Sequence, residues 1–173
     1  MNDTAAYIGE ACRFYVMLVL FAAAIGKVGG VRAFQGTLAT VFGITGPWSR
    51  VVALAVIVLE GGVGTLLLFG GEVARVAMMI AAALVVIFAA TISTVLARRT
   101  PVACNCFGGS SHVISGFDLA RSASLLAACA FYFAQYTPVA SFSFIGLVLM
   151  FGVAVITATL SVRLSDIAFL MRR

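Results

Sequence analysis

The sequence predicts an all-α integral membrane bundle of about five transmembrane helices, and its composition, its segment lengths and its charge placement all support this class. Of 173 residues, 63% are hydrophobic and only 10% are charged. Soluble domains are typically about a quarter charged and at most half apolar. A soluble chain of this size could not hide so much apolar surface from water. We therefore expect the lipid bilayer to surround the protein.

The first two expected spans are residues 13–31 and 49–69, because each has about the 20 mainly apolar residues that a helix needs to cross the hydrocarbon core. The N-terminus has no basic start of the kind that cleavable signal peptides have, and it carries Asp3 and Glu10 instead. The first span should therefore remain as a membrane anchor.

The connection between these spans contains apolar residues at helical spacing, which predicts a short amphipathic piece. These residues are Phe34, Leu38, Val41 and Phe42. Trp48, which follows Pro47, suits the headgroup level as an interfacial anchor.

Three more spans are expected at residues 74–97, 116–136 and 142–160. The stretch at 116–136 gives the weakest signal, because Asp118 and Arg121 lie in its first turns. Short links at 70–72 and 137–141 require neighbouring helices to be antiparallel. No internal repeat is visible, so residues 1–173 should form one transmembrane domain.

The basic residues predict an orientation. Of the 11 Lys and Arg residues, all but Arg13 and Arg75 lie in or next to the segments that are expected on one side of the membrane. The positive-inside rule then puts the N-terminus outside and the C-terminus in the cytoplasm of a bacterial plasma membrane. No basic patch is interleaved with aromatic residues, so nucleic acid is not an expected partner. The nine residues on the basic side are Lys27, Arg32, Arg50, Arg98, Arg99, Arg121, Arg163, Arg172 and Arg173.

The connection at residues 98–115 holds the densest chemistry, with Cys104 and Cys106 one residue apart in a glycine-containing loop. Their spacing brings the Cα atoms within disulfide range, and the strain of so small a ring would make the bond easy to reduce. Two alternatives stay open: buried filler cysteines, and a metal site completed by His112. The spacing matches no familiar zinc pattern, so we expect neither a metal nor a cofactor.

The other two cysteines have packing as their default interpretation. Cys129 lies within the span at 116–136, and Cys12 lies at the opposite end of the bundle from the cysteine loop.

Three charged residues within the spans are the other candidate site residues, because intramembrane charges are costly and usually face the bundle interior. Glu60 lies near the middle of the second span, beside Gly61 and Gly62, and must be either paired or protonated. Lys27 and Arg121 lie nearer helix ends, where basic side chains commonly snorkel to the headgroups. Glu60 could pair with either of them.

These features together resemble the methylamine utilisation protein family MauE, a branch of the DoxX-like membrane proteins. The resemblance rests on Lys27 closing the first span, Glu60-Gly61-Gly62 in the second, the Cys104-Asn-Cys106-Phe-Gly element, and Arg121 opening the next helix. It covers about residues 13–136 and implies a four-helix core, with the helix at 142–160 as an addition.

The resemblance implies a membrane thiol–disulfide exchange protein that acts with a thioredoxin-like partner in maturing disulfide-rich proteins outside the cytoplasm. Cys104 and Cys106 would form its redox pair, supported by Lys27, Glu60 and Arg121. The charge count, however, puts the cysteine loop at the cytoplasmic face.

The alternative function is a non-catalytic accessory or scaffold subunit of a larger bacterial membrane complex, such as an envelope transporter. Runs of small residues at 26–30 and 61–64 would permit packing against partner subunits. A weaker third possibility is a small carrier or channel with Glu60 as its intramembrane acid, although many transporters show an internal duplication that this chain lacks.

Overall fold

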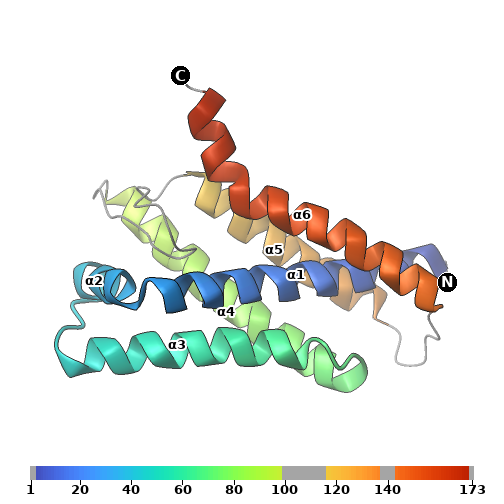
Figure 1. Ribbon diagram of the computed structural model, residues 1–173, viewed down its shortest axis with the longest axis horizontal. Coiled ribbons are helices and arrows are strands. Elements are labelled where there is room, and N and C mark those ends of the chain that lie inside the picture. Colours follow the sequence, from blue (N-terminus) through green and yellow to red (C-terminus); the bar gives the residue numbers. More distant parts are fainter. Residues whose placement is uncertain (1–2, 99–115, 137–142, 172–173) are drawn as a thin grey trace.

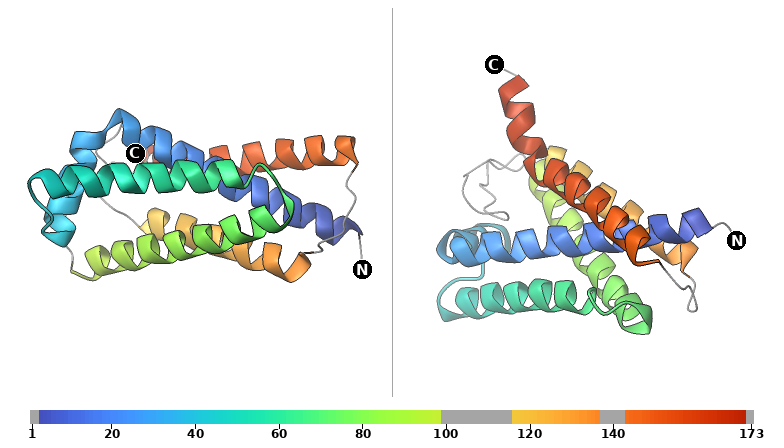
Figure 2. Two further views of the ribbon diagram at one scale, coloured as in Figure 1. Left: turned by 90° about the horizontal axis from the view of Figure 1, so that it is seen from below. Right: turned by 45° about the vertical axis from the view of Figure 1, so that its right-hand side comes forward.

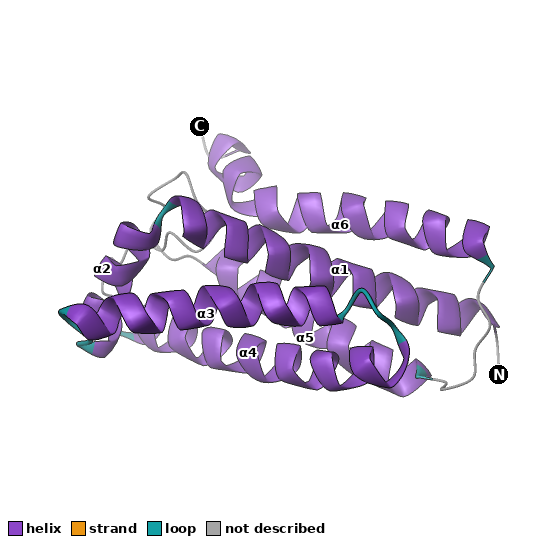
Figure 3. Ribbon diagram, turned by 60° about the horizontal axis from the view of Figure 1, so that its bottom comes forward, coloured by secondary structure: helices purple, strands orange, loops and turns teal. Residues whose placement is uncertain are grey.

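The computed structural model describes residues 3–98, 116–136 and 143–171, and this part of the chain is helical with short connections and no strand (Figures 1 and 3). The all-α prediction is therefore confirmed. The helices are α1 (Asp3–Gly29), α2 (Val31–Phe42), α3 (Pro47–Leu66), α4 (Gly71–Ala97), α5 (Gly116–Gln135) and α6 (Phe144–Met171).

Five of these helices, all except α2, are long and apolar enough to cross a membrane. Their outer faces carry large apolar side chains that no other part of the described chain covers. Such surfaces are stable in lipid and not in water. The protein is therefore a multi-pass membrane protein.

Helix α1 is the centre of the bundle. It contacts each of the other helices. Half of its most apolar 18-residue stretch is buried within the protein, whereas only 11% of the corresponding stretch of α6 is buried. Val16 and Val19 of α1 are almost fully enclosed. Helix α6 packs on the outside of a core formed by α1, α3, α4 and α5.

The connections divide the bundle into two ends (Figures 1 and 2). Helix α2, the last turn of α4 and the first turn of α5 lie together at what we call the α2 end. The N-terminus and the α3–α4 turn lie at the opposite end, which we call the N-terminal end. At the latter, Gly70 and Gly71 have φ values of 71° and 56°, a conformation that glycine adopts without a steric penalty.

The amphipathic piece predicted between the first two spans is confirmed as α2. Phe34 and Leu38 are buried against Ala53 of α3, whereas Phe42 is exposed. Trp48, in the first turn of α3, is also exposed, and its role as an interfacial anchor stays a prediction. Helix α2 therefore lies across the α2 end of the bundle and packs on α3.

One predicted boundary was wrong. The first helix begins at Asp3 and its candidate span at Thr4, not at residue 13, and Glu10 and Arg13 neutralise each other within one helical turn at an N–O distance of 2.7 Å. The last predicted span, residues 142–160, agrees closely with the candidate span Phe144–Arg163. Helix α6 continues beyond this span to Met171, and its final turns project away from the bundle (Figure 1).

Helices α1 and α6 approach closely at Gly146. A Cβ atom at this position would lie 2.9 Å from Cζ of Tyr7, and the Tyr7 hydroxyl accepts a hydrogen bond from the backbone N–H of Ser143 at 3.0 Å.

We expect Gly146→Ala to displace the Tyr7 ring and to cost about 1–3 kcal/mol of stability, as overpacking generally does. Thermal unfolding in detergent micelles would show a lowered midpoint.

The matched control is Gly152→Ala on the same helix, where a Cβ atom meets nothing within 4 Å. This variant should unfold at the wild-type temperature or slightly above it, because alanine favours helix. Equal midpoints for the two variants would contradict the close approach of α1 and α6.

Candidate functional site: a buried ion pair beside an apolar cavity

Lys27 and Glu60 form an ion pair inside the bundle. The Lys27 Nζ atom donates hydrogen bonds to Oε1 of Glu60 at 2.7 Å and to Oε2 at 2.8 Å. The two side chains are only 2% and 1% exposed. Glu60 was expected to be either paired or protonated, and it is paired. Lys27 was expected to extend to the headgroups, and this interpretation was wrong, because its side chain is buried against Glu60.

The pattern of α3 explains why Glu60 faces α1. The buried residues Ala53, Ile57, Glu60 and Gly64 recur every three or four positions, so they share one face of the helix. Glu60 is the one charged member of that face. Its position in an otherwise apolar stripe makes a partner on α1 necessary, since an unpaired buried charge is very costly.

The glycines directly beside Glu60 make no close contact with the described part of the chain. A Cβ atom at Gly61 or Gly62 would meet nothing within 4 Å, whereas one at Gly64 would lie 3.3 Å from the Phe21 ring of α1. The close approach between α1 and α3 is therefore at Gly64, one turn beyond the carboxylate.

Two aromatic rings from different helices stand near the ammonium group. The Nζ atom of Lys27 lies 5.5 Å from the ring centroid of Phe34 on α2 and 5.2 Å from that of Phe88 on α4. Both distances allow an electrostatic attraction between the cation and the ring face. Sequence reasoning placed Phe34 on the amphipathic piece but did not find Phe88, which carries no local signal.

The ion pair lies against a cavity of about 300 Å³, which we call the Lys27 cavity. Its walls are almost wholly apolar, and all the helices except α6 contribute to them. The three charged residues predicted within the spans, Lys27, Glu60 and Arg121, all border it. Other lining residues include Ala23, Phe34, Val56, Phe88, Thr91 and Ser122.

Arg121 is paired within its own helix. Its guanidinium donates to Asp118 Oδ1 at 2.7 Å, and the two side chains are 10% and 19% exposed. Free snorkelling was therefore the wrong interpretation of Arg121, and Asp118 is a site residue that the sequence reasoning treated only as a weakness of the span. The three-residue spacing between Asp118 and Arg121 could have predicted this ion pair from the sequence, because side chains three apart on a helix are neighbours.

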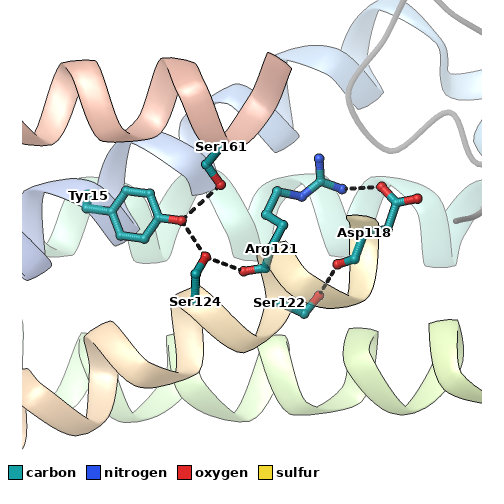
Figure 4. A network of polar contacts seen from close by, with 6 residues as sticks. All are labelled: Tyr15, Asp118, Arg121, Ser122, Ser124 and Ser161. Carbon is teal, nitrogen blue, oxygen red and sulfur yellow. Dashed lines mark hydrogen bonds and ion pairs between the residues drawn. The ribbon is translucent and has the colours of Figure 1, made fainter. Parts of the chain in front are cut away.

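A hydroxyl network beside Arg121 joins three helices (Figure 4). The Tyr15 hydroxyl of α1 contacts Ser124 of α5 at 2.8 Å and donates to Ser161 of α6 at 2.9 Å. The Ser124 hydroxyl in turn donates to the Arg121 carbonyl. This network holds α6 against the core and fixes the first turns of α5, from which Arg121 borders the Lys27 cavity.

A second buried cation, Arg13, lies at the N-terminal end of the bundle. Its Nε donates to Glu10, and its Nη1 donates to the Leu67 carbonyl at the end of α3. That carbonyl has no partner within its own helix. Arg13 therefore joins α1 to the end of α3, a structural role that its position in the sequence did not reveal.

Cys104, Cys106 and His112 lie outside the described residues, so the predicted redox pair and its metal alternative stay predictions. Cys129 is buried in the main core, and Cys12 is partly buried against that core. Packing accounts for both. Within the described ranges, no group of three His, Cys, Asp or Glu side chains could hold a metal ion.

The fold and this site define a multi-pass helical membrane protein with a charged pair enclosed in its core. A family model described as methylamine utilisation protein MauE matches residues 5–135, and the chain belongs to that family. The matched range contains α2 and the four core helices, whereas α6 lies beyond it. No curated protein and no solved structure matches the chain significantly.

The ion pair leads to a test of stability. Lys27→Met leaves a buried carboxylate without its partner, and breaking a buried pair in this way typically costs about 3–5 kcal/mol. The double variant Lys27→Met/Glu60→Met removes both charges and should recover most of that loss. The measurement is the unfolding midpoint in micelles or bicelles.

Arg75→Met supplies the control, because the Arg75–Glu72 pair is 3.3 Å long and its side chains are 49% and 65% exposed. Exposed pairs contribute at most about 1 kcal/mol, so this variant should be nearly neutral. A double variant no more stable than Lys27→Met alone would contradict the coupling of Lys27 with Glu60.

Proposed function

We propose that this protein is a membrane thiol–disulfide exchange protein that uses Cys104 and Cys106 with a thioredoxin-like partner. One observation carries the proposal. The segment that holds both cysteines connects α4 to α5, and these helices supply Phe88, Arg121 and Ser122 to the Lys27 cavity. The ends of that segment, at Arg98 and Gly116, are thereby fixed at the α2 end of the bundle.

The exchange itself moves two electrons and two protons. A thiolate of the partner attacks the Cys104–Cys106 disulfide, and a mixed disulfide forms between the two proteins. The partner's second thiolate then breaks this bond, so the partner leaves oxidised and both cysteines become thiols. The strain of a disulfide between residues two apart favours the reaction in this direction.

Thiol trapping tests this proposal. In membranes treated with a mild oxidant, Cys104 and Cys106 should form a disulfide that dithiothreitol reverses, as detected by the gel shift of a maleimide reagent. A partner whose second cysteine is replaced by serine should accumulate a mixed disulfide with this protein, because the thiol that breaks that bond is missing. Cys12→Ser/Cys129→Ser is the control and should behave as wild type. If the two loop cysteines stay reduced under every redox condition, the proposal fails.

We place the protein in a bacterial plasma membrane with the α2 end toward the cytoplasm. Lys27 and Arg121 lie within α1 and α5 with largely buried side chains, so we do not count them among the loop residues to which the positive-inside rule applies. The excess of basic residues on the side of the α2 end persists without these two, because seven of the nine basic residues on that side remain. These are Arg32, Arg50, Arg98, Arg99, Arg163, Arg172 and Arg173.

Single cysteines test the orientation on a background in which all four native cysteines are serine. Thr45→Cys reports the α2 end and Phe69→Cys the N-terminal end, and both positions are exposed. A membrane-impermeant maleimide should label Phe69→Cys in spheroplasts and Thr45→Cys in inverted vesicles. The reverse pattern would place the cysteine loop outside.

The second candidate is an accessory subunit that does not turn over. The open surface at Gly61 and Gly62 favours it, because small residues let a helix of another subunit approach closely. Gentle purification of the tagged protein separates the two functions. A stoichiometric complex that survives Cys104→Ser/Cys106→Ser would favour the accessory role, and a mixed disulfide lost in that variant would favour exchange.

A further inference from the structure

Among residues 3–98, 116–136 and 143–171, no acceptor takes the third donor of the Lys27 ammonium group. An ammonium has three N–H donors, and the hydrogen bonds of Lys27 go only to the two oxygens of Glu60. The ring centroids of Phe34 and Phe88 lie 5.5 and 5.2 Å from the ammonium nitrogen. The side chain is almost fully buried and borders the Lys27 cavity. A buried donor of this kind favours a ligand with an acceptor atom.

The charges around the cavity restrict that ligand to a neutral molecule. Lys27 is balanced by Glu60, and Arg121 is balanced by Asp118. An anion such as a lipid phosphate would have to lose its hydration in an apolar cavity without gaining an unbalanced cation. A plain acyl chain would leave the Lys27 donor without an acceptor.

We propose that the Lys27 cavity binds the head group of an isoprenoid quinone. A quinone ring is flat, neutral and soluble in the bilayer, so it can pack against Phe34 and Phe88 while one carbonyl oxygen accepts the third N–H of Lys27. The volume of about 300 Å³ is at the lower end of ligand pockets. The cavity can therefore accommodate the quinone ring, while the isoprenoid tail stays outside it.

This inference rests on the proposed function for its chemistry, because it supplies the electron acceptor that the exchange requires. The thiols of Cys104 and Cys106 lose two electrons and two protons as the S–S bond forms. The quinone gains the same two electrons and two protons and leaves as the hydroquinone. Lys27 holds the carbonyl oxygen on which negative charge develops during the transfer.

Filling the cavity tests binding without relying on activity. Val56 lines the cavity on α3, and Val58, two residues further along, is 72% exposed to lipid. Val56→Phe should fill the space for the ring, whereas Val58→Phe makes the same chemical change on the outer surface. Both variants are purified in native-membrane nanodiscs, and their bound quinone is extracted and quantified by liquid chromatography with mass spectrometry.

We expect about one quinone per protein above the membrane background in wild type and Val58→Phe, and at least a tenfold loss in Val56→Phe. Added decyl-quinone should raise the unfolding midpoint of wild type and Val58→Phe by several degrees, and that of Val56→Phe not at all. Equal quinone contents in the two variants, or fatty acyl chains in place of quinone, would overturn the inference.

The variant Cys104→Ser/Cys106→Ser, which lacks only the two loop cysteines, separates the two proposals. Quinone binding should persist in this variant, because the cavity is built without the loop cysteines. Binding that persists while thiol trapping fails would refute only the exchange function. Thiol trapping that succeeds without any quinone binding would refute only the cavity assignment.

Discussion

The pairing of Lys27 with Glu60 determines how the other parts of the core are placed. Both side chains are almost fully buried, so each charge is tolerated only while the other is within hydrogen-bond distance. The pair therefore fixes the register between the end of α1 and the middle of α3. Helix α2 begins directly after α1 and packs on α3, so its position across the bundle end follows from that register, and so does the position of the cavity beneath it.

The charged side chains of the described residues form two kinds of ion pair, one within a single helix and one between helices. Glu10–Arg13, Glu72–Arg75 and Asp118–Arg121 are pairs three residues apart on single helices, which neutralise charge locally and do not specify how helices pack. Lys27–Glu60 joins two helices and does specify it, as does the hydrogen bond from Arg13 to the Leu67 carbonyl. Contacts of this second kind make the folded bundle differ in energy from other arrangements of the same apolar helices, because lipid provides little hydrophobic discrimination between them.

Composition and segment length were sufficient to predict the five spans and the amphipathic α2, because the bilayer imposes a length on every spanning helix. They could not predict which cation pairs with Glu60, since that choice depends on the rotation of α1, α3 and α5 about their axes. The same limit applies to the close contact between α1 and α3, whose position at Gly64 also depends on helix rotation. Phe88 was missed because an aromatic residue in an apolar helix resembles any lipid-facing one. The assignment of Cys104 and Cys106 remains a prediction from the family pattern and the loop.

The central position of α1 also has a consequence for biosynthesis. This helix leaves the ribosome before α2 to α6, yet its surface depends most on helices that are made later. Lys27 lies in the last turn of α1, and Glu60 is not available to it until α3 has been translated. Until then the ammonium group can extend toward the headgroups, as basic side chains near helix ends commonly do. Insertion of α1 and α3 is thus a coupled event, and the carboxylate of the later helix completes the membrane placement of the earlier one.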